Sequence, residues 1–327
     1  MLEQSQTPEQ RQTDDPELAR LAHAAHQMQE RRRGRERDAA LAELLLGVHG
    51  PRLTRLKNLI NTHEARDLED LVFTDLRAGR VRQRILDHFA DEADRLDIGD
   101  PKVLSDIDDT ALCALNDRRY PRGTVYPGLL ALYQALDQGP SGRPFDTGDL
   151  TFLTARPKDA WGLIEGYSRE VLRRAGISKM SMLSGGLRNL FSHRSMATRK
   201  LTNVRRYRRL FPEYGLVFLG DSGQGDVIVG EQLYARHGPA VRLVLIHDVV
   251  ATDRAERQAY AERGIWFVDT YVGAALVAWR HGLISDGSLA RVAAEAVADF
   301  ERLRWDSPEQ RVRMRELFER DLAALPD

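Results

Sequence analysis

The chain has 327 residues, of which 30% are charged, with a formal net charge of -1 and a single cysteine. The balanced charge excludes a globally basic nucleic-acid-binding protein, and the lone Cys113 excludes an intramolecular disulfide and most cysteine-based zinc sites. No apolar run approaches the ~18 residues of a membrane span, and the first ten residues lack an apolar signal region. These features predict a cytoplasmic protein.

The first 99 residues are expected to be helical, because no strand pattern occurs before residue 102. Asp15 followed by Pro16 is typical of a helix start, with a capping carboxylate and a residue suited to the first turn. An apolar stripe at 41–48 predicts a helix that Gly50-Pro51 ends. Further helices are predicted at 65–77 and 79–96.

From residue 102 onward, short apolar runs alternate with helical patterns, which is typical of a parallel sheet buried on both faces. The predicted strands are Val103–Ile107, Leu150–Leu153, Lys179–Leu183, Leu216–Leu219, Val241–Ile246 and Ile265–Val268. The predicted helices between them are 127–138, 157–175, 194–210, 223–236 and 253–262, and later helices fall at 274–279, 287–304 and 308–323. The expected fold class is α/β, with a Rossmann-like core at 100–283, a helical N-terminal region at 1–99 and a C-terminal helical extension at 284–327.

An acidic cluster follows the first predicted strand. Asp106 and Asp108 are two residues apart and share one face of an extended chain, and Asp109 comes next. Crowded carboxylates repel one another unless a cation compensates them, and hard cations such as Mg²⁺ prefer oxygen ligands. A turn with solvated aspartates is the alternative interpretation of this motif on its own.

Polar residues also follow later strands. Leu216–Leu219 leads into Gly-Asp-Ser-Gly-Gln-Gly-Asp, which contains Asp221 and Asp226. Thr154 ends the second predicted strand, where it suits either phosphate binding or helix capping. Lys200 is one of five lysines against 43 arginines and precedes the strand that carries Asp221. A solvated lysine and an ordinary Asp-Ser-Gly turn are the alternatives for these features taken singly.

In combination, these motifs resemble the signatures of the haloacid-dehalogenase-like phosphatase superfamily. The order is Asp106/Asp108, then Thr154, then Lys200, then Asp221/Asp226. Residues 102–250 are more narrowly similar to the catalytic domain of the fungal actin-patch phosphatidate phosphatase family, through Ser-Asp-Ile-Asp-Asp-Thr, Tyr-Pro-Gly at 126–128 and the segment at 220–226. The second motif, Leu-Thr-Ala-Arg-Pro, departs from the serine-rich version typical of the fungal enzymes.

The resemblance implies hydrolysis of a phosphate monoester in two steps. Asp106 is implied as the nucleophile that forms an aspartyl-phosphate, and Asp108 as the acid that protonates the leaving oxygen and then activates water. Thr154 and Lys200 are implied to hold phosphoryl oxygens.

The cofactor implied is Mg²⁺, held by Asp106, Asp108 through its backbone carbonyl, Asp221 and Asp226. The substrate is expected to contact Arg156, Arg188 and Ser222.

The neutral total charge hides a basic segment. Residues 171–212 contain 11 lysines and arginines and no acid. A basic surface around Lys200 predicts a phosphorylated anionic substrate, such as a lipid headgroup or a nucleotide, and leaves peripheral contact with a membrane open. A basic helix paired with acidic terminal helices is the alternative. The competing functions are a phosphatase of nucleic-acid ends or nucleotides and a non-catalytic scaffold; the oligomeric state stays open.

Overall fold

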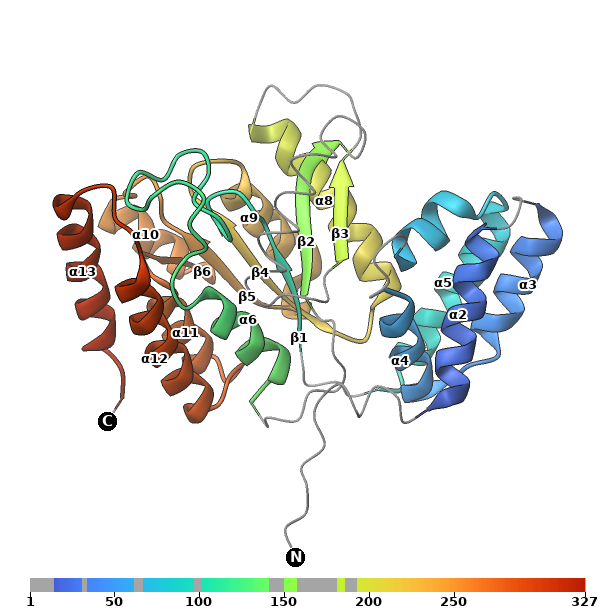
Figure 1. Cartoon of the computed structure of the whole chain (residues 1–327). Coiled ribbons are helices and arrows are strands. Elements are labelled where there is room, and N and C mark those ends of the chain that lie inside the picture. Colours follow the sequence, from blue (N-terminus) through green and yellow to red (C-terminus); the bar gives the residue numbers. More distant parts are fainter. Residues whose placement is uncertain are drawn as a thin grey trace, which may run out of the picture.

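The structure is a computed structural model that describes residues 15–30, 34–61, 67–96, 101–140, 150–157, 181–185 and 193–326, and only the backbone at 154–157, 181–185 and 193–196. Figure 1 shows a central sheet with helices on both sides. The helices are α2 (Pro16–Glu30), α3 (Arg35–Leu46), α4 (Gly50–Asn61), α5 (Gly79–Ala93), α6 (Leu129–Gln138), α8 (His193–Leu210), α9 (Asp226–His237), α10 (Arg254–Ala261), α11 (Tyr271–Arg280), α12 (Asp286–Arg302) and α13 (Pro308–Leu322), with a π-helix at Asp70–Asp75 and a 3₁₀ turn at Gly238–Ala240.

The sheet confirms the predicted α/β fold class. Its six described strands pair in parallel in the order β3-β2-β1-β4-β5-β6. The strands are β1 (Pro101–Ser105), β2 (Leu150–Pro157), β3 (Ser181–Gly185), β4 (Gly215–Asp221), β5 (Val241–His247) and β6 (Ile265–Val268). All six strand predictions meet a strand, with shifts of at most four residues at their ends; Ile265–Val268 matches at both ends. The helix predicted at 157–175 lies outside the described residues.

Both faces of the sheet are buried because successive side chains of each strand point to opposite faces. On β1, Val103 joins one hydrophobic core and Leu104 joins the other. On β4, Val217 and Phe218 divide in the same way. This explains why these strands are continuously apolar in sequence rather than alternating.

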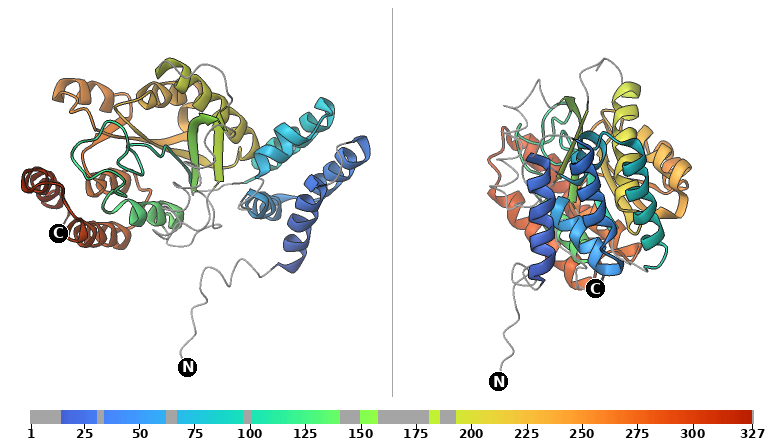
Figure 2. Two further views of the ribbon diagram at one scale, coloured as in Figure 1. Left: turned by 45° about the horizontal axis from the view of Figure 1, so that its top comes forward. Right: turned by 90° about the vertical axis from the view of Figure 1, so that its right-hand side faces the viewer.

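Each core is closed by its own set of helices. The core on the Val103 side contains apolar residues of α6, α11, α12 and α13. The core on the Leu104 side contains those of α8 and α9 and also those of the N-terminal helices α2–α5. Figures 1 and 2 show the N-terminal and C-terminal helices at opposite ends of the sheet. The helical ends of the chain are therefore continuous with the cores of the α/β unit.

The N-terminal helices confirm one sequence expectation and correct another. Oδ1 of Asp15 accepts hydrogen bonds from the amides of Glu17 and Leu18 at 3.2 and 3.1 Å, so this residue caps α2 as predicted. Gly50-Pro51 was expected to end a helix, but it begins α4, which the sequence did not predict. Proline is suited to the first turn of a helix as well as to the residues beyond its end, which makes the pair ambiguous. Part of the helix predicted at 65–77 is the π-helix at Asp70–Asp75.

A buried ion pair fastens α4 to the segment after α8. Nζ of Lys57 lies 2.6 Å from Oε1 of Glu213 and donates to the carbonyl of Leu210 at 2.9 Å. The hydroxyl of Thr54 donates to the same carboxylate at 3.0 Å. Burial lowers the pKa of Lys57, and Glu213 opposes that effect. Because both charges are buried, each depends on its partner.

Candidate active site

Polar side chains gather where the two central strands end. Asp106 directly follows β1, and Asp221 is the last residue of β4. Ser105 pairs with Leu219 in parallel register, and the amide of Asp106 extends this ladder by donating to the carbonyl of Leu219 at 2.9 Å. The direction of strand addition reverses between β1 and β4. In open α/β sheets this switch point, at the carboxyl ends of the strands, is where ligands bind.

Three buried carboxylates meet at this switch point. One oxygen each of Asp106, Asp221 and Asp226 lies within 4.8 Å of the others. Asp226 is the first residue of α9, and its Oδ2 accepts a hydrogen bond from the amide of Asp221 at 3.2 Å. Gly220 is required here, because a Cβ at that position would lie 2.4 Å from the Cβ of Asp226. The glycine-containing segment thus brings the start of α9 against the end of β4.

Lys200 completes the cluster from α8. Its Nζ lies 2.8 Å from Oδ1 of Asp106 and 2.5 Å from Oδ1 of Asp226, and the side chain is buried. Burial lowers the pKa of Lys200, but the two carboxylates outweigh burial and raise it above the usual value. The lysine is therefore a fixed positive charge. The structure brings together the sequence-predicted residues Asp106, Lys200, Asp221 and Asp226.

The carboxylates carry more negative charge than one lysine balances. Burial raises the pKa of Asp106 to about 7; Lys200 opposes this shift, and Asp226 and Asp108 add to it. Burial, followed by Asp226 and Asp106, also raises the pKa of Asp221 well above its usual value. A further cation would relieve this repulsion.

The donor set fits a hard divalent cation. All three side chains offer carboxylate oxygens, the ligand type that Mg²⁺ prefers. Oδ2 of Asp106 is buried and has no hydrogen-bond partner among the described residues. A buried acceptor of this kind is costly unless something satisfies it, and a cation would do so.

Asp108 lies at the edge of this cluster and is partly exposed. Its backbone carbonyl accepts a hydrogen bond from Nε2 of Gln224 at 3.3 Å, and the same amide donates to Oδ2 of Asp221 at 3.1 Å. The amide of Gly223 donates to Oδ1 of Asp221 at 2.7 Å. Gln224 therefore orients two groups predicted as cation ligands, a role that the sequence analysis did not assign.

Asp109 has a structural role that the sequence analysis missed. It adopts a φ of 58°, and its carboxylate accepts hydrogen bonds from the amides of Ala114 and Leu115, both at 2.9 Å, and of Asn116 at 2.6 Å. Aspartate tolerates this left-handed conformation and commonly binds nearby backbone amides. The third aspartate of the motif therefore stabilises the loop beside the site. Nothing in the sequence distinguishes this structural aspartate from the two proposed catalytic aspartates that precede it.

A second missed group is His247, the last residue of β5. Arginine can only donate, so Nη2 of Arg119 donates to Nε2 of His247 at 2.9 Å. The proton of the neutral ring is then on Nδ1, which donates to the carbonyl of Asp109 at 2.8 Å. Burial, assisted by Arg119, lowers the pKa of His247 to about 4. The neutral imidazole thus anchors the Asp109 turn against β5.

The structure gives less detail for the remaining predicted site residues. Thr154 and Arg156 lie on β2, beside β1, with only their backbone described, and Arg188 lies outside the described residues. The hydroxyl of Ser222 donates to Oδ1 of Asp248 at 2.9 Å and accepts from the amide of Val249 at 2.9 Å. In this structure Ser222 joins the segment after β4 to the segment after β5, and its predicted contact with substrate stays a prediction.

Part of the basic segment is used within the chain. On α8, Arg206 forms a 2.7 Å ion pair with Glu69, and Arg209 donates to Oε1 of Gln83 at 2.9 Å. Arg208 donates to three backbone carbonyls between residues 211 and 214. Arg206 and Arg209 contact the N-terminal region, and Arg208 holds the end of α8. Of these three only Arg206 pairs with an acid, so the alternative of a basic helix paired with acidic terminal helices is met in part.

Comparison with known families agrees with this site. Residues 101–248 match the model of the catalytic domain of phosphatidate phosphatase APP1, and the match includes the cluster from Asp106 to Asp226. No curated protein and no solved structure matches the chain. The match confirms the resemblance found in the sequence and supports a hydrolase of the phosphatase class. The matched segment is shorter than half of the chain, and the helices on either side of it lie outside the match.

Proposed function

We propose that this catalytic domain of the phosphatidate phosphatase type hydrolyses phosphate monoesters with Asp106 as the nucleophile and Mg²⁺ as the cofactor. The observation that carries the proposal is the arrangement of Lys200 and three buried carboxylates at the ends of β1 and β4. This arrangement agrees with a haloacid-dehalogenase-like site.

Asp106 is suited to attack phosphorus. Its Oδ1 lies 2.8 Å from Lys200 and its Oδ2 has no hydrogen-bond partner among the described residues, so one carboxylate oxygen would hold the cation while the other attacks. In the first step a bond forms between a carboxylate oxygen of Asp106 and phosphorus while the bond from phosphorus to the alcohol oxygen breaks. The product is an aspartyl-phosphate, and the departing oxygen needs a proton.

Asp108 is the proposed source of that proton. It is two residues from Asp106 and partly exposed, so it can exchange protons with solvent. Its carboxyl group protonates the leaving alcohol oxygen and then takes a proton from the water that attacks phosphorus. Phosphate leaves, and the carboxylate of Asp106 is restored.

Lys200 and the cofactor balance charge during both steps. Asp106, Asp221 and Asp226, with the carbonyl of Asp108, would hold Mg²⁺, which supplies Lewis-acid stabilisation and cancels the repulsion between carboxylate and phosphate. Lys200 is already fixed between two carboxylates and offers a donor to a phosphoryl oxygen without reorganisation. Thr154 would contact another phosphoryl oxygen.

Phosphatidate is the first substrate to test, because the matched family is named for that activity. No helix among the described residues is long and apolar enough to cross a bilayer, so access to a lipid would be by peripheral contact. Nucleotides and nucleic-acid ends are the alternative substrates, on the basis of the basic segment at 171–212.

The test is phosphate release with Mg²⁺ from phosphatidate in mixed micelles, a nucleoside monophosphate, a 5′-phosphorylated oligonucleotide and an aryl phosphate. The proposal expects release from at least one, abolished by EDTA and by Asp106→Asn. Release that survives Asp106→Asn would overturn the nucleophile assignment. Release from the aryl phosphate without release from phosphatidate would remove the lipid substrate. A protein that neither binds Mg²⁺ nor releases phosphate would instead be a scaffold.

A further inference from the structure

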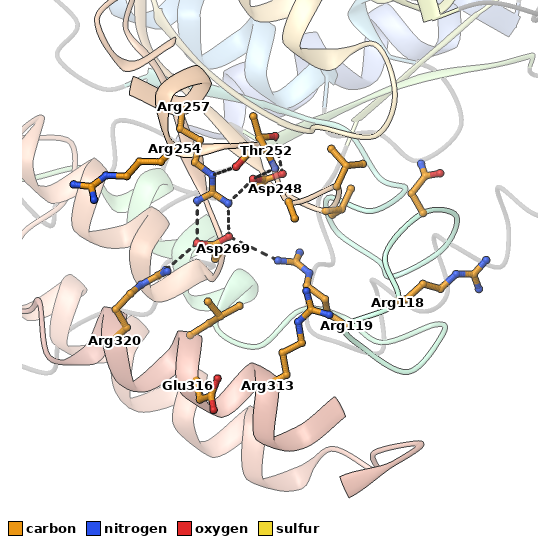
Figure 3. A pocket seen from close by; sticks show the side chains of 15 residues that line it. Arg118, Arg119, Asp248, Thr252, Arg254, Arg257, Asp269, Arg313, Glu316 and Arg320 are labelled. Atoms are coloured by element: carbon orange, nitrogen blue, oxygen red, sulfur yellow. Dashed lines mark hydrogen bonds and ion pairs between the residues drawn. The ribbon is translucent and has the colours of Figure 1, made fainter. Parts of the chain in front are cut away.

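A polar pocket lies on the same edge of the sheet as the proposed catalytic carboxylates. It is formed at the ends of β5 and β6, where Asp248 and Asp269 follow the last strand residues, and α13 closes its outer side. Its volume is about 710 Å³, within the range of roughly 300–1,000 Å³ typical of ligand pockets. Figure 3 shows side chains from the loop around Arg119, from α10 and from α13 pointing toward one another, namely Arg119, Arg257, Arg313 and Arg320. Arg118 and Arg254 extend away from this group.

The pocket contains an excess of positive charge. Six arginines line it, against three carboxylates. Two of these carboxylates are already neutralised inside the protein. Asp269 binds Arg257 at 2.6 Å and Arg320 at 2.9 Å, and Asp248 binds Arg257 and accepts from the amide of Thr252. Arg119 and Arg320 also pair with Asp117 and Asp321, which do not line the pocket. The unbalanced charge therefore comes from Arg118, Arg254 and Arg313, against which Glu316 is the one remaining lining acid.

Three of the six lining arginines have no ion-pair partner among the described residues, and of these three Arg313 is the one that points toward Arg119 in Figure 3. Among the described residues, the side chains of Arg118, Arg254 and Arg313 have no carboxylate within ion-pair distance, and all three are exposed. Figure 3 shows Arg313 reaching from α13 toward Arg119, which itself is held by Asp117 at 3.0 Å. Two guanidinium groups that converge in this way favour an anion between them.

The pocket is physically joined to the catalytic site. Asp248, on its wall, accepts a hydrogen bond from Ser222, the residue after Asp221. The side-chain amide of Asn116, also on its wall, donates to the carbonyl of Gly223 at 3.5 Å. The backbone amide of Asn116 donates to the carboxylate of Asp109, which holds this loop in place. A ligand in the pocket would thus lie beside the segment that holds the catalytic carboxylates.

We propose that this arginine pocket is a second anion site that binds a phosphate-bearing group, separate from the group that is hydrolysed. Guanidinium groups bind phosphate through paired, charge-assisted hydrogen bonds, which explains the use of arginine from three different elements. The family match ends at Asp248, whereas Asp269, Arg313 and Arg320 come from residues beyond it. The C-terminal helix therefore adds this site to the matched domain.

Two sources can supply such a group: the headgroup of an anionic lipid or a soluble phosphorylated compound. Exposed apolar side chains next to the pocket make the lipid the first to test. Val250, on its wall, is 53% exposed, and Leu115, which precedes Asn116, is 45% exposed. Apolar tips beside cationic side chains are suited to a bilayer surface.

The experiment measures binding by the full chain. One arm uses phosphatidylcholine vesicles that contain phosphatidylglycerol, a phosphodiester that a monoester phosphatase does not consume. The other arm uses inorganic pyrophosphate in calorimetry. The pocket variant is Arg313→Ala, because this arginine has no ion-pair partner among the described residues and points toward Arg119 (Figure 3). The matched control is Arg84→Ala, which removes an exposed arginine from the sixth position of α5, as Arg313 stands at the sixth position of α13. Thermal melting verifies that both variants fold.

We expect the pocket variant to weaken binding at least about tenfold in one arm while the control stays within about twofold of wild type. Loss in the vesicle arm identifies the lipid headgroup, and loss in the pyrophosphate arm identifies a soluble ligand. Equal binding by the pocket variant and the control in both arms, or no binding by the wild type, overturns the proposal. Because the readout is binding of ligands that need not be hydrolysed, the result does not depend on the role of Asp106.

Discussion

Lys200 holds one oxygen of Asp106 and leaves the other without a hydrogen bond among the described residues. The lysine thereby orients the proposed nucleophile and, among the described residues, also carries the positive charge nearest to it. These two effects can be separated by measuring activity and cation binding in the same variants.

We expect Lys200→Met to lower phosphate release by roughly 100-fold or more, the scale reported for removing one preorganised donor at a transition state. Mg²⁺ should bind at least as tightly as to the wild type, because the variant removes a positive charge from a cluster of three carboxylates. Steady-state kinetics and Mg²⁺ calorimetry measure the two quantities. Lys200→Arg keeps the charge and serves as the control. A parallel loss of Mg²⁺ binding in Lys200→Met would contradict the assigned role.

Asp221→Asn and Asp108→Asn should affect different properties. Asp221 lies within the buried carboxylate cluster, so its variant should weaken Mg²⁺ binding at least about tenfold, the scale on which even outer-shell partners of a metal act. Asp108 is proposed to bind Mg²⁺ only through its backbone carbonyl, so its variant should retain binding and lose turnover. The shift of the melting temperature with Mg²⁺ concentration reports binding in both. Equal loss of Mg²⁺ binding in the two variants would show that the side chain of Asp108 is itself a ligand of the cation.

His247 should make stability depend on pH. Its pKa is lowered to about 4 in the folded chain, against about 6.5 when unfolded, so the fold favours the neutral ring. Its contribution is complete above pH 6.5 and is lost as pH falls toward 4. Between pH 7 and pH 5 the loss should be on the order of 2 kcal/mol.

Urea unfolding of the wild type and of His247→Gln at pH 7 and pH 5 measures this contribution. Asp106, whose pKa is raised, gives the opposite slope in the same interval, so the difference between the two proteins is the relevant quantity. The variant should be less stable at pH 7, and the gap should narrow at pH 5. A gap independent of pH would show that His247 does not titrate differently on folding.

The ion pair between Lys57 and Glu213 should be essential to the attachment of the N-terminal helices. Lys57→Met leaves a buried carboxylate without its cation and should lower the free energy of unfolding by about 3–5 kcal/mol. Adding Glu213→Gln removes that unpaired charge and should recover part of the loss. Urea unfolding of both single variants and the double variant forms the required cycle. Simple additivity would mean that the two charges do not depend on each other.

The strand pattern and the motif order were sufficient to predict the sheet and the cluster of Asp106, Lys200, Asp221 and Asp226. The sheet rests on local signals, namely continuous apolar runs, and the three aspartates follow two of these runs. Lys200 lies on a helix, and its place in the cluster was predicted only from the order of motifs in the resembled superfamily. The roles of Asp109 and His247 could not be predicted, because they depend on a left-handed backbone and on contacts between the loop after β1 and the end of β5. The arginine pocket combines side chains from residue 116 to residue 320, and nothing in the local sequence indicates that they meet. The start of α4 was missed because Gly50-Pro51 is compatible with either end of a helix.

The pairing of β5 with β6 limits where the chain can be truncated without exposing the sheet. Val244 to His247 of β5 are paired with Ile265 to Val268 of β6, yet the matched domain ends between the two strands. A protein cut at residue 248 would present β5 as an open, apolar edge, the kind of surface along which sheets aggregate. It would also lose Val268 from one core and Ile265 from the other. The smallest soluble fragment with activity should therefore extend past β6, and catalytic-domain boundaries drawn from family similarity should be lengthened before expression.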